Sequence, residues 1–157
     1  MQFRLLDRID RIELGRSIRA SRMLRPDENY LDDHFPRFPV MPGVLMLEAM
    51  FQAGMWLVLE TEEYQRPFVA LKEVRNIRYT DFVTPNQTLT VTAEIFASND
   101  HLYKLKAEGR IGDSVAVSGR LFLETTPLVD QWSTQGPSEG YVQNHLKELY
   151  RELQPET

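Results

Sequence analysis

The chain has 157 residues, a net charge of −5 and no cysteine, and 42% of its residues are hydrophobic. This composition is typical of one globular domain with a sizeable core. It excludes disulfide bonds and thiolate chemistry, and the acidic balance argues against a nucleic-acid-binding protein, which would usually present a basic stripe. The N-terminus is charged and lacks the apolar core of a signal peptide, so we expect a cytoplasmic protein.

The first elements along the chain read as a β-hairpin. Residues 3–13 and 16–23 alternate polar and apolar side chains around a turn at Leu14-Gly15. Residues 5–14 also place Leu and Ile three and four apart, which is the pattern of a helix, so that alternative stays open. A turn at 25–29 is expected to lead into a short helical turn that ends near Leu31.

A stiff loop and a long apolar helix follow. Residues 34–43 contain three prolines, each of which restricts its own backbone and that of the residue before it. The predicted helix covers residues 44–60, and residues 44–59 contain only two strongly polar side chains, Glu48 and Gln52, which lie four apart and therefore on one face. A helix that is apolar all round is covered by other structure. Its length and charged flanks fall short of a transmembrane span, so we predict a buried central helix.

The second half of the chain changes to a period of two. Strands are predicted over residues 68–79, 89–95, 102–110 and 115–123, and the last three are joined by tight turns into an antiparallel meander. Together with the hairpin, these strands give five or six strands and one buried helix.

The C-terminal part differs in composition. We divide the chain into a domain over residues 1–126 and an appended linker and helix over residues 127–157. Residues 141–153 place apolar side chains along one face of the predicted helix. We expect this helix to pack on its own domain; alternatively, it crosses to a partner subunit or covers a substrate entrance.

The loop and the central helix together contain a family motif. The run HFPxxPVMPGVLxxEAxxQ, residues 34–52, resembles the active-site segment of the FabZ/FabA family of 3-hydroxyacyl-[acyl-carrier-protein] dehydratases. His34, Gly43 and Glu48 stand at the family spacing, and a glutamate rather than an aspartate favours the FabZ branch. The resemblance implies an α+β hot-dog fold, in which an antiparallel sheet wraps around one long buried apolar helix.

The same resemblance implies a reaction and its residues. Water would leave a 3-hydroxyacyl thioester to give a trans-2-enoyl thioester in fatty-acid or related acyl-chain biosynthesis, with no metal and no cofactor. His34 would remove the C2 proton, and Glu48 would hold the proton that leaves with the hydroxyl group. The backbone N–H of Gly43, beside Val44 at the helix N-terminus, would stabilise the thioester oxygen. Gln52 would form hydrogen bonds within the site or the helix.

The implied partners are a thioester carrier and a second copy of the chain. In the family, the histidine and the acid come from different subunits of a homodimer or a larger homo-oligomer. The carrier is an acidic acyl-carrier protein or coenzyme A, and the basic candidates for docking it are Arg37, Lys72, Arg75 and Arg78. Arg37 stands where the family usually has glycine.

Three rival functions remain open: a hot-dog thioesterase, a dehydratase-isomerase and a non-catalytic acyl-binding subunit. The acyl chain length and the number of subunits are also open.

Overall fold

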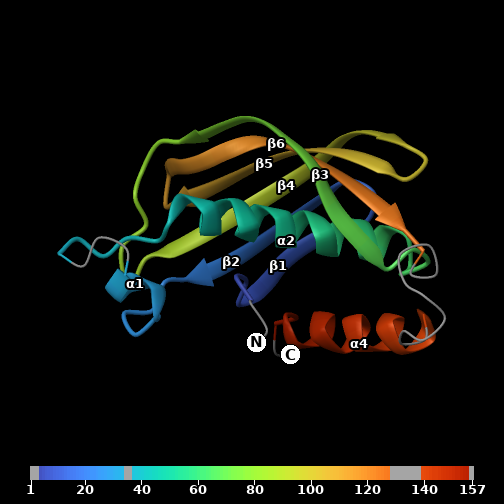
Figure 1. Cartoon of the computed structure of the whole chain (residues 1–157), viewed down its shortest axis with the longest axis horizontal. Helices are drawn as coiled ribbons and strands as arrows, with labels where there is room; N and C mark the ends of the chain where they lie inside the picture. Colours follow the sequence, from blue (N-terminus) through green and yellow to red (C-terminus); the bar gives the residue numbers. More distant parts are fainter. Residues whose placement is uncertain (1–3, 34–36, 128–138, 156–157) are drawn as a thin grey trace.

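Six strands form one antiparallel sheet in the order β1-β2-β4-β5-β6-β3 (Figure 1). The computed structural model describes residues 4–33, 37–127 and 139–155. The strands are β1 (Arg8–Glu13), β2 (Ser17–Met23), β3 (Phe68–Tyr79), β4 (Thr88–Asn99), β5 (Leu102–Ile111) and β6 (Ser114–Thr126). The helices are α1 (Tyr30–Asp33), α2 (Gly43–Thr61) and α4 (Glu139–Glu152).

Helix α2 runs across the inner face of the sheet and forms the centre of the core (Figure 1). The strands turn their alternate apolar side chains toward it, as the buried Leu89, Val91 and Ala93 of β4 illustrate. Gly54 lets the helix come close, because a Cβ atom there would lie 3.1 Å from the side chains of Leu105 and Leu123. This arrangement confirms the predicted hot-dog fold, with one sheet wrapped around one long apolar helix.

The burial of α2 is uneven within the single chain. Its sheet-facing side is fully buried, whereas Glu48, Phe51, Gln52 and Met55 on another side are half-buried and Val44 is 66% exposed. By length and composition alone, α2 is the one helix among the described residues that could cross a membrane, and 56% of that stretch is buried inside the fold. Burial of this extent is what a core helix shows.

The N-terminal hairpin is confirmed, but its first strand begins later than expected. β1 starts at Arg8 rather than at residue 3, and the helical alternative for residues 5–14 is wrong. The reason is that Leu5 and Leu6 are buried side chains of the core. Their stretch of backbone lies beside α2, where the N–H of Leu5 donates to the side chain of Gln52 instead of to a neighbouring strand. The meander of β4, β5 and β6 is as predicted, and β3 pairs with β6.

Helix α4 packs against its own chain, antiparallel to α2 and close to the N-terminus (Figure 1). Near its start, the Gln143 side-chain amide donates to the backbone oxygen of Tyr64, at 2.8 Å. Further along, the rings of Tyr150 and Trp56 lie 5.8 Å apart. Just after its end, the backbone oxygen of Leu153 accepts from the N–H of Ile9, at 2.7 Å. α4 is therefore attached along its whole length.

A buried polar cluster fixes the C-terminal end of α2 to the sheet. The side chain of Glu62 is only 7% exposed and forms an ion pair with Arg66, at 2.7 Å. The same carboxylate accepts hydrogen bonds from the hydroxyl groups of Tyr103, at 2.6 Å, and Thr125, at 3.0 Å. Burial, together with the bond to Glu62, raises the pKa of Tyr103 to about 12. One carboxylate thus joins α2 to β5 and β6.

We expect Glu62→Gln to lower the free energy of unfolding by about 2–4 kcal/mol, because it removes a buried charge on which three donors depend. Urea denaturation measures the loss. The matched control is Glu108→Gln, which removes an exposed ion pair with Arg110 and should cost less than about 1 kcal/mol. Equal losses in the two variants would contradict a structural role for the Glu62 cluster.

Candidate active site

Glu48, the acid of the family motif, lies one turn and a half into α2 on its half-buried side. The other motif residue with acid–base chemistry, His34, lies outside the described residues. Glu48 needs a polar neighbour, because a carboxylate without one is costly to remove from water. That neighbour comes from the next turn of the same helix.

Gln52 links Glu48 to the N-terminal segment. Its side-chain oxygen accepts a hydrogen bond from the backbone N–H of Leu5, at 2.9 Å. Since that N–H is always a donor, the amide has only one orientation that satisfies it. The amide nitrogen then faces Glu48 and donates to its Oε1, at 3.2 Å. Oε1 of Glu48 is therefore an acceptor, and a proton on this carboxyl group would sit on Oε2.

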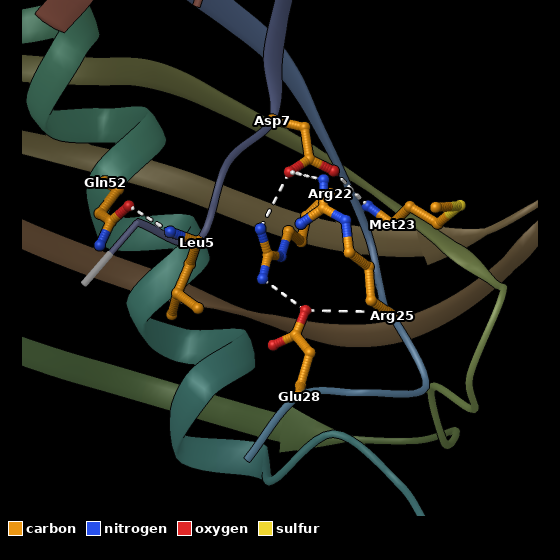
Figure 2. Close-up of polar contacts among 7 residues, drawn as sticks. All are labelled: Leu5, Asp7, Arg22, Met23, Arg25, Glu28 and Gln52. Atoms are coloured by element: carbon orange, nitrogen blue, oxygen red, sulfur yellow. Dashed lines mark hydrogen bonds and ion pairs between the residues drawn. The ribbon is translucent and has the colours of Figure 1, made fainter. Parts of the chain in front are cut away.

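An ion-pair cluster holds the segment that carries Leu5 (Figure 2). Arg22, with a side chain only 11% exposed, pairs with Asp7 on one side and Glu28 on the other. The second oxygen of Asp7 accepts from the backbone N–H of Met23, at 2.8 Å. Because Asp7 is two residues from Leu5, the cluster fixes where the Leu5 N–H points. It thereby sets the orientation of Gln52 and, through it, of Glu48.

Gly43 is the first residue of α2 and lies in a different hollow. The residue before it is Pro42, and no described side chain caps this end of the helix. The first N–H groups of a helix have no partner within it and carry partial positive charge. A Cβ atom at Gly43 would lie 3.0 Å from the ring of Tyr79. At the glycine expected for close approach of a thioester, a larger residue would therefore also crowd an aromatic side chain of β3.

The hollow at Gly43 has a volume of about 410 Å³. Its lining residues come from the loop before α2, the first turn of α2 and the end of β3: Val40, Met41, Gly43, Met46, Tyr79, Thr80, Asp81 and Phe82. The ring of Phe38 meets that of the lining residue Phe82 edge-on, at 5.5 Å between centroids. Phe38, Val44, Tyr79 and Phe82 are all large apolar side chains left exposed. Exposed apolar side chains of this kind are typical of a surface that binds a ligand or another protein chain.

Gly43 and Glu48 do not share one hollow within a single chain. Five residues of α-helix turn through about 140° and rise about 7.5 Å. Gly43 therefore faces Tyr79, whereas Glu48 and Gln52 line a second pocket of about 220 Å³ beside α4. Val44 points to neither pocket and is exposed. One chain brings Glu48 and Gln52 together and leaves Gly43 apart from them.

The four basic candidates for docking a carrier fall into two groups. Lys72 pairs with Glu124, at 2.8 Å, and Arg75 pairs with Glu73, at 2.7 Å, so the charges of both are balanced locally. Arg75 also lies over the ring of Phe122. Arg37 and Arg78 are exposed and form no ion pair with a described residue. Arg78 lines a hollow on the outer face of the sheet that also contains Glu94 and Glu108.

Sequence reasoning missed Tyr79, the Leu5 backbone N–H and the apolar side chains of α4 that share a pocket with Glu48. The amphipathic pattern of residues 141–153 showed that this helix has an apolar face, but no pattern could show which surface that face meets. Across the described ranges, no group of three or more His, Asp or Glu side chains could hold a metal ion.

Comparisons with known proteins agree on one family. The family model described as the FabA-like domain matches residues 1–120. A relative from Lactobacillus helveticus, named 3-hydroxyacyl-[acyl-carrier-protein] dehydratase FabZ, is 33% identical over 116 residues, or 74% of this chain and 78% of the relative. A protein of the same name from Syntrophomonas wolfei is 35% identical over 117 residues, covering 74% and 81% of the two chains.

Solved structures extend the likeness to the fold. The dehydratase heterocomplex ApeI:P from Xenorhabdus doucetiae has a TM-score of 0.64 at 18% identity, covering 81% of this chain and 88% of that one. A thioesterase from Pseudomonas aeruginosa, PA1618, has a TM-score of 0.61 at 14% identity, covering 76% and 81%. At these identities the two structures support a shared fold and nothing more specific. The family model and the FabZ relatives together show that the chain belongs to the FabA-like domain family, as the motif at residues 34–52 indicated.

Proposed function

We propose that this chain is a hydro-lyase that removes water from 3-hydroxyacyl thioesters in acyl-chain biosynthesis, with each active site shared between two copies. The observation that carries the proposal is the separation of Gly43 and Glu48 on α2. Both belong to the family motif, yet they face hollows about 140° apart around the helix. A reaction that needs the groups together requires a second subunit to bring its own Glu48 to the loop and the Gly43 hollow.

The surface of the single chain supports a homodimer. The sheet order places β1 and β3 at its edges, and β1 is bonded to the end of α4 through Ile9 and Leu153. β3 is long and keeps an open edge among the described residues, with Phe68 and Tyr79 exposed along it. Long, exposed edge strands are templates for pairing with another chain. Pairing there would also cover the apolar group at the start of α2.

The proposed chemistry follows from the charges that develop during elimination. His34 takes the proton from C2, and the electrons of that C–H bond form the C2–C3 double bond. The hydroxyl group at C3 leaves as water with the proton from Oε2 of the partner subunit's Glu48. The first N–H groups of α2 stabilise the negative charge on the thioester oxygen. Gln52 keeps Glu48 in the orientation in which Oε2 is the proton donor.

The rival functions differ in what they require. A thioesterase needs a water molecule directed at the thioester carbonyl. The solved thioesterase structure is only 14% identical to this chain, so the similarity concerns the fold alone. The relatives at 33% and 35% identity are all named dehydratases. A non-catalytic acyl-binding subunit has no use for a carboxylate that is oriented by an amide and a clamped backbone. Only the dehydratase proposal assigns a function to the hydrogen bonds that run from the Leu5 N–H through Gln52 to Glu48.

The test of the reaction is hydration of a crotonyl thioester, measured by loss of the enoyl absorbance. We expect turnover by the wild type and a fall of roughly 100- to 10,000-fold in both His34→Ala and Glu48→Gln, the range for a lost general acid or base. Asp32→Asn, at an exposed carboxylate near His34 in sequence, is the control and should stay within twofold. Full activity in either motif variant, or release of free thiol instead of hydration, would overturn the proposal.

We propose that an acidic acyl-carrier protein docks on Arg37 and Arg78, which form no ion pair with a described acid. Arg78 is adjacent in sequence to Tyr79, which lines the hollow at Gly43, while the side chain of Arg78 lies in a separate hollow on the outer face of the sheet. A carrier bound there would deliver its thioester to the start of α2. Charge complementarity of this kind acts mainly on the association rate and is weakened by salt.

We therefore expect Arg78→Gln to raise the KM for a carrier-linked substrate by roughly threefold to tenfold, with a weaker salt dependence. The KM for the corresponding coenzyme A thioester should not change. Lys72→Gln is the matched control on the same strand, and its effect should be smaller because Glu124 already neutralises Lys72. Equal effects on both substrates would rule out Arg78 as a docking residue.

A further inference from the structure

The interface between α4 and α2 contains an apolar pocket with no function assigned to it so far. Its volume is about 220 Å³. Three elements line it: the N-terminal segment (Arg4, Leu6), α2 (Glu48, Phe51, Gln52, Met55, Trp56) and α4 with the residue after it (Leu146, Leu149, Leu153). Protein interiors are packed closely, with few voids larger than a water molecule. A hollow of this size beside the proposed catalytic acid therefore needs an explanation.

Loose attachment of α4 does not account for the hollow. The helix is held near its start by Gln143, in its last turn by the Tyr150–Trp56 ring contact and after its end by Leu153. An ion pair between Arg4 and Glu152, at 2.6 Å, adds a further contact near that end. The pocket therefore lies between two points at which α4 is attached to the rest of the chain, one near the start of the helix and one at its end.

The pocket has a polar end and an apolar end. Gln52 and Glu48 are joined by a hydrogen bond and lie at the level of the N-terminal segment, where Arg4 precedes Leu5. Because α4 runs antiparallel to α2, its Leu153 lies at that polar end and its Leu146 lies one turn beyond the Trp56–Tyr150 contact. From Glu48 toward Leu146, the lining changes from one that includes charged and amide groups to one of aliphatic, thioether and aromatic side chains. This polarity matches a ligand with a polar head and a hydrocarbon tail.

We infer that this pocket takes the hydrocarbon chain of the acyl substrate, and that α4 sets the longest chain the protein accepts. The inference rests on the proposed dehydratase function for the identity of the polar head, which is the thioester and its 3-hydroxyl group at Glu48. The tail then runs along α2, away from its N-terminus and under α4. Leu146 closes the far end. Residues 139–155, which supply this wall, lie outside the part of the chain that the family model matches, residues 1–120.

The volume gives a chain length. A cavity of about 150 Å³ holds a benzene ring, so about 220 Å³ holds a chain of roughly six to nine carbons. Each buried methylene adds to affinity, and about two of them correspond to roughly a tenfold change. Affinity should therefore rise steeply up to a medium-length chain and stop rising once the tail reaches Leu146.

The experiment measures binding of saturated acyl-pantetheine thioesters by calorimetry, using butyryl, octanoyl and dodecanoyl chains. Saturated thioesters have neither the hydroxyl group nor the double bond, so binding is read without turnover. Leu146→Trp fills the far end and Leu146→Ala enlarges it. Asn144→Trp, at an exposed position on α4, is the control for adding an indole to this helix. Thermal melting verifies that each variant is folded.

We expect the wild type to bind octanoyl at least tenfold more tightly than butyryl, with no further gain for dodecanoyl. Leu146→Trp should weaken octanoyl binding by roughly tenfold or more, while butyryl stays within twofold. Leu146→Ala should instead improve dodecanoyl binding. Equal shifts for all chain lengths, or the same shifts in Asn144→Trp, would overturn the inference.

Failure of the inference and failure of the proposed function give different results. If crotonyl hydration depends on His34 and Glu48, but substitutions of Leu146 do not change how affinity varies with acyl chain length, the pocket is not the acyl site and the dehydratase proposal stands. If no hydration occurs but the binding profile shifts with Leu146, the pocket binds acyl chains in a protein that is not a dehydratase.

Discussion

The structure depends on one constraint, which is that α2 must be covered on more than one side. A helix that is apolar all round is unstable in water unless other elements remove its surface from solvent. The sheet covers one side and reaches the backbone closely at Gly54. Helix α4 covers part of a second side through Trp56. The start of the helix, with Val44 exposed, is left uncovered in a single chain, and this is where we propose that the second subunit binds.

The polar side chains of α2 need hydrogen-bond partners, because the rest of the helix is apolar. Glu48 and Gln52 interrupt an otherwise apolar surface, and each accepts a hydrogen bond from a defined donor. The Gln52 amide donates to Glu48, and the Leu5 backbone N–H donates to Gln52. The ion pairs of Arg22 hold the N-terminal segment in place without adding net charge to it, since Asp7 and Glu28 face Arg22 and Arg25. The orientation of one carboxylate is thus determined by a cluster two elements away.

Much of this arrangement could be predicted from the sequence because its signals are local. The period of two over residues 89–95 and the apolar run over residues 44–60 identified the strands and the helix, and the motif spacing selected Glu48 and Gly43 as candidate site residues. The start of β1 was wrong by five residues, because whether Leu5 lies in a strand or beside α2 depends on Gln52, which is 47 positions away. The partners of Gly43, Lys72 and α4 are likewise distant in sequence, and periodicity contains no information about them.

The division of the motif between two hollows is the centre of the account, and subunit mixing tests it most directly. His34→Ala and Glu48→Gln chains, each inactive alone, are co-expressed with different tags, and the mixed oligomers are purified and assayed for crotonyl hydration. If each site combines His34 of one chain with Glu48 of another, every mixed dimer contains one intact site and one site with both defects, so the purified mixed dimers regain about half of the sites. If both residues of a site come from the same chain, every site carries one defect, and the mixture stays as inactive as its components.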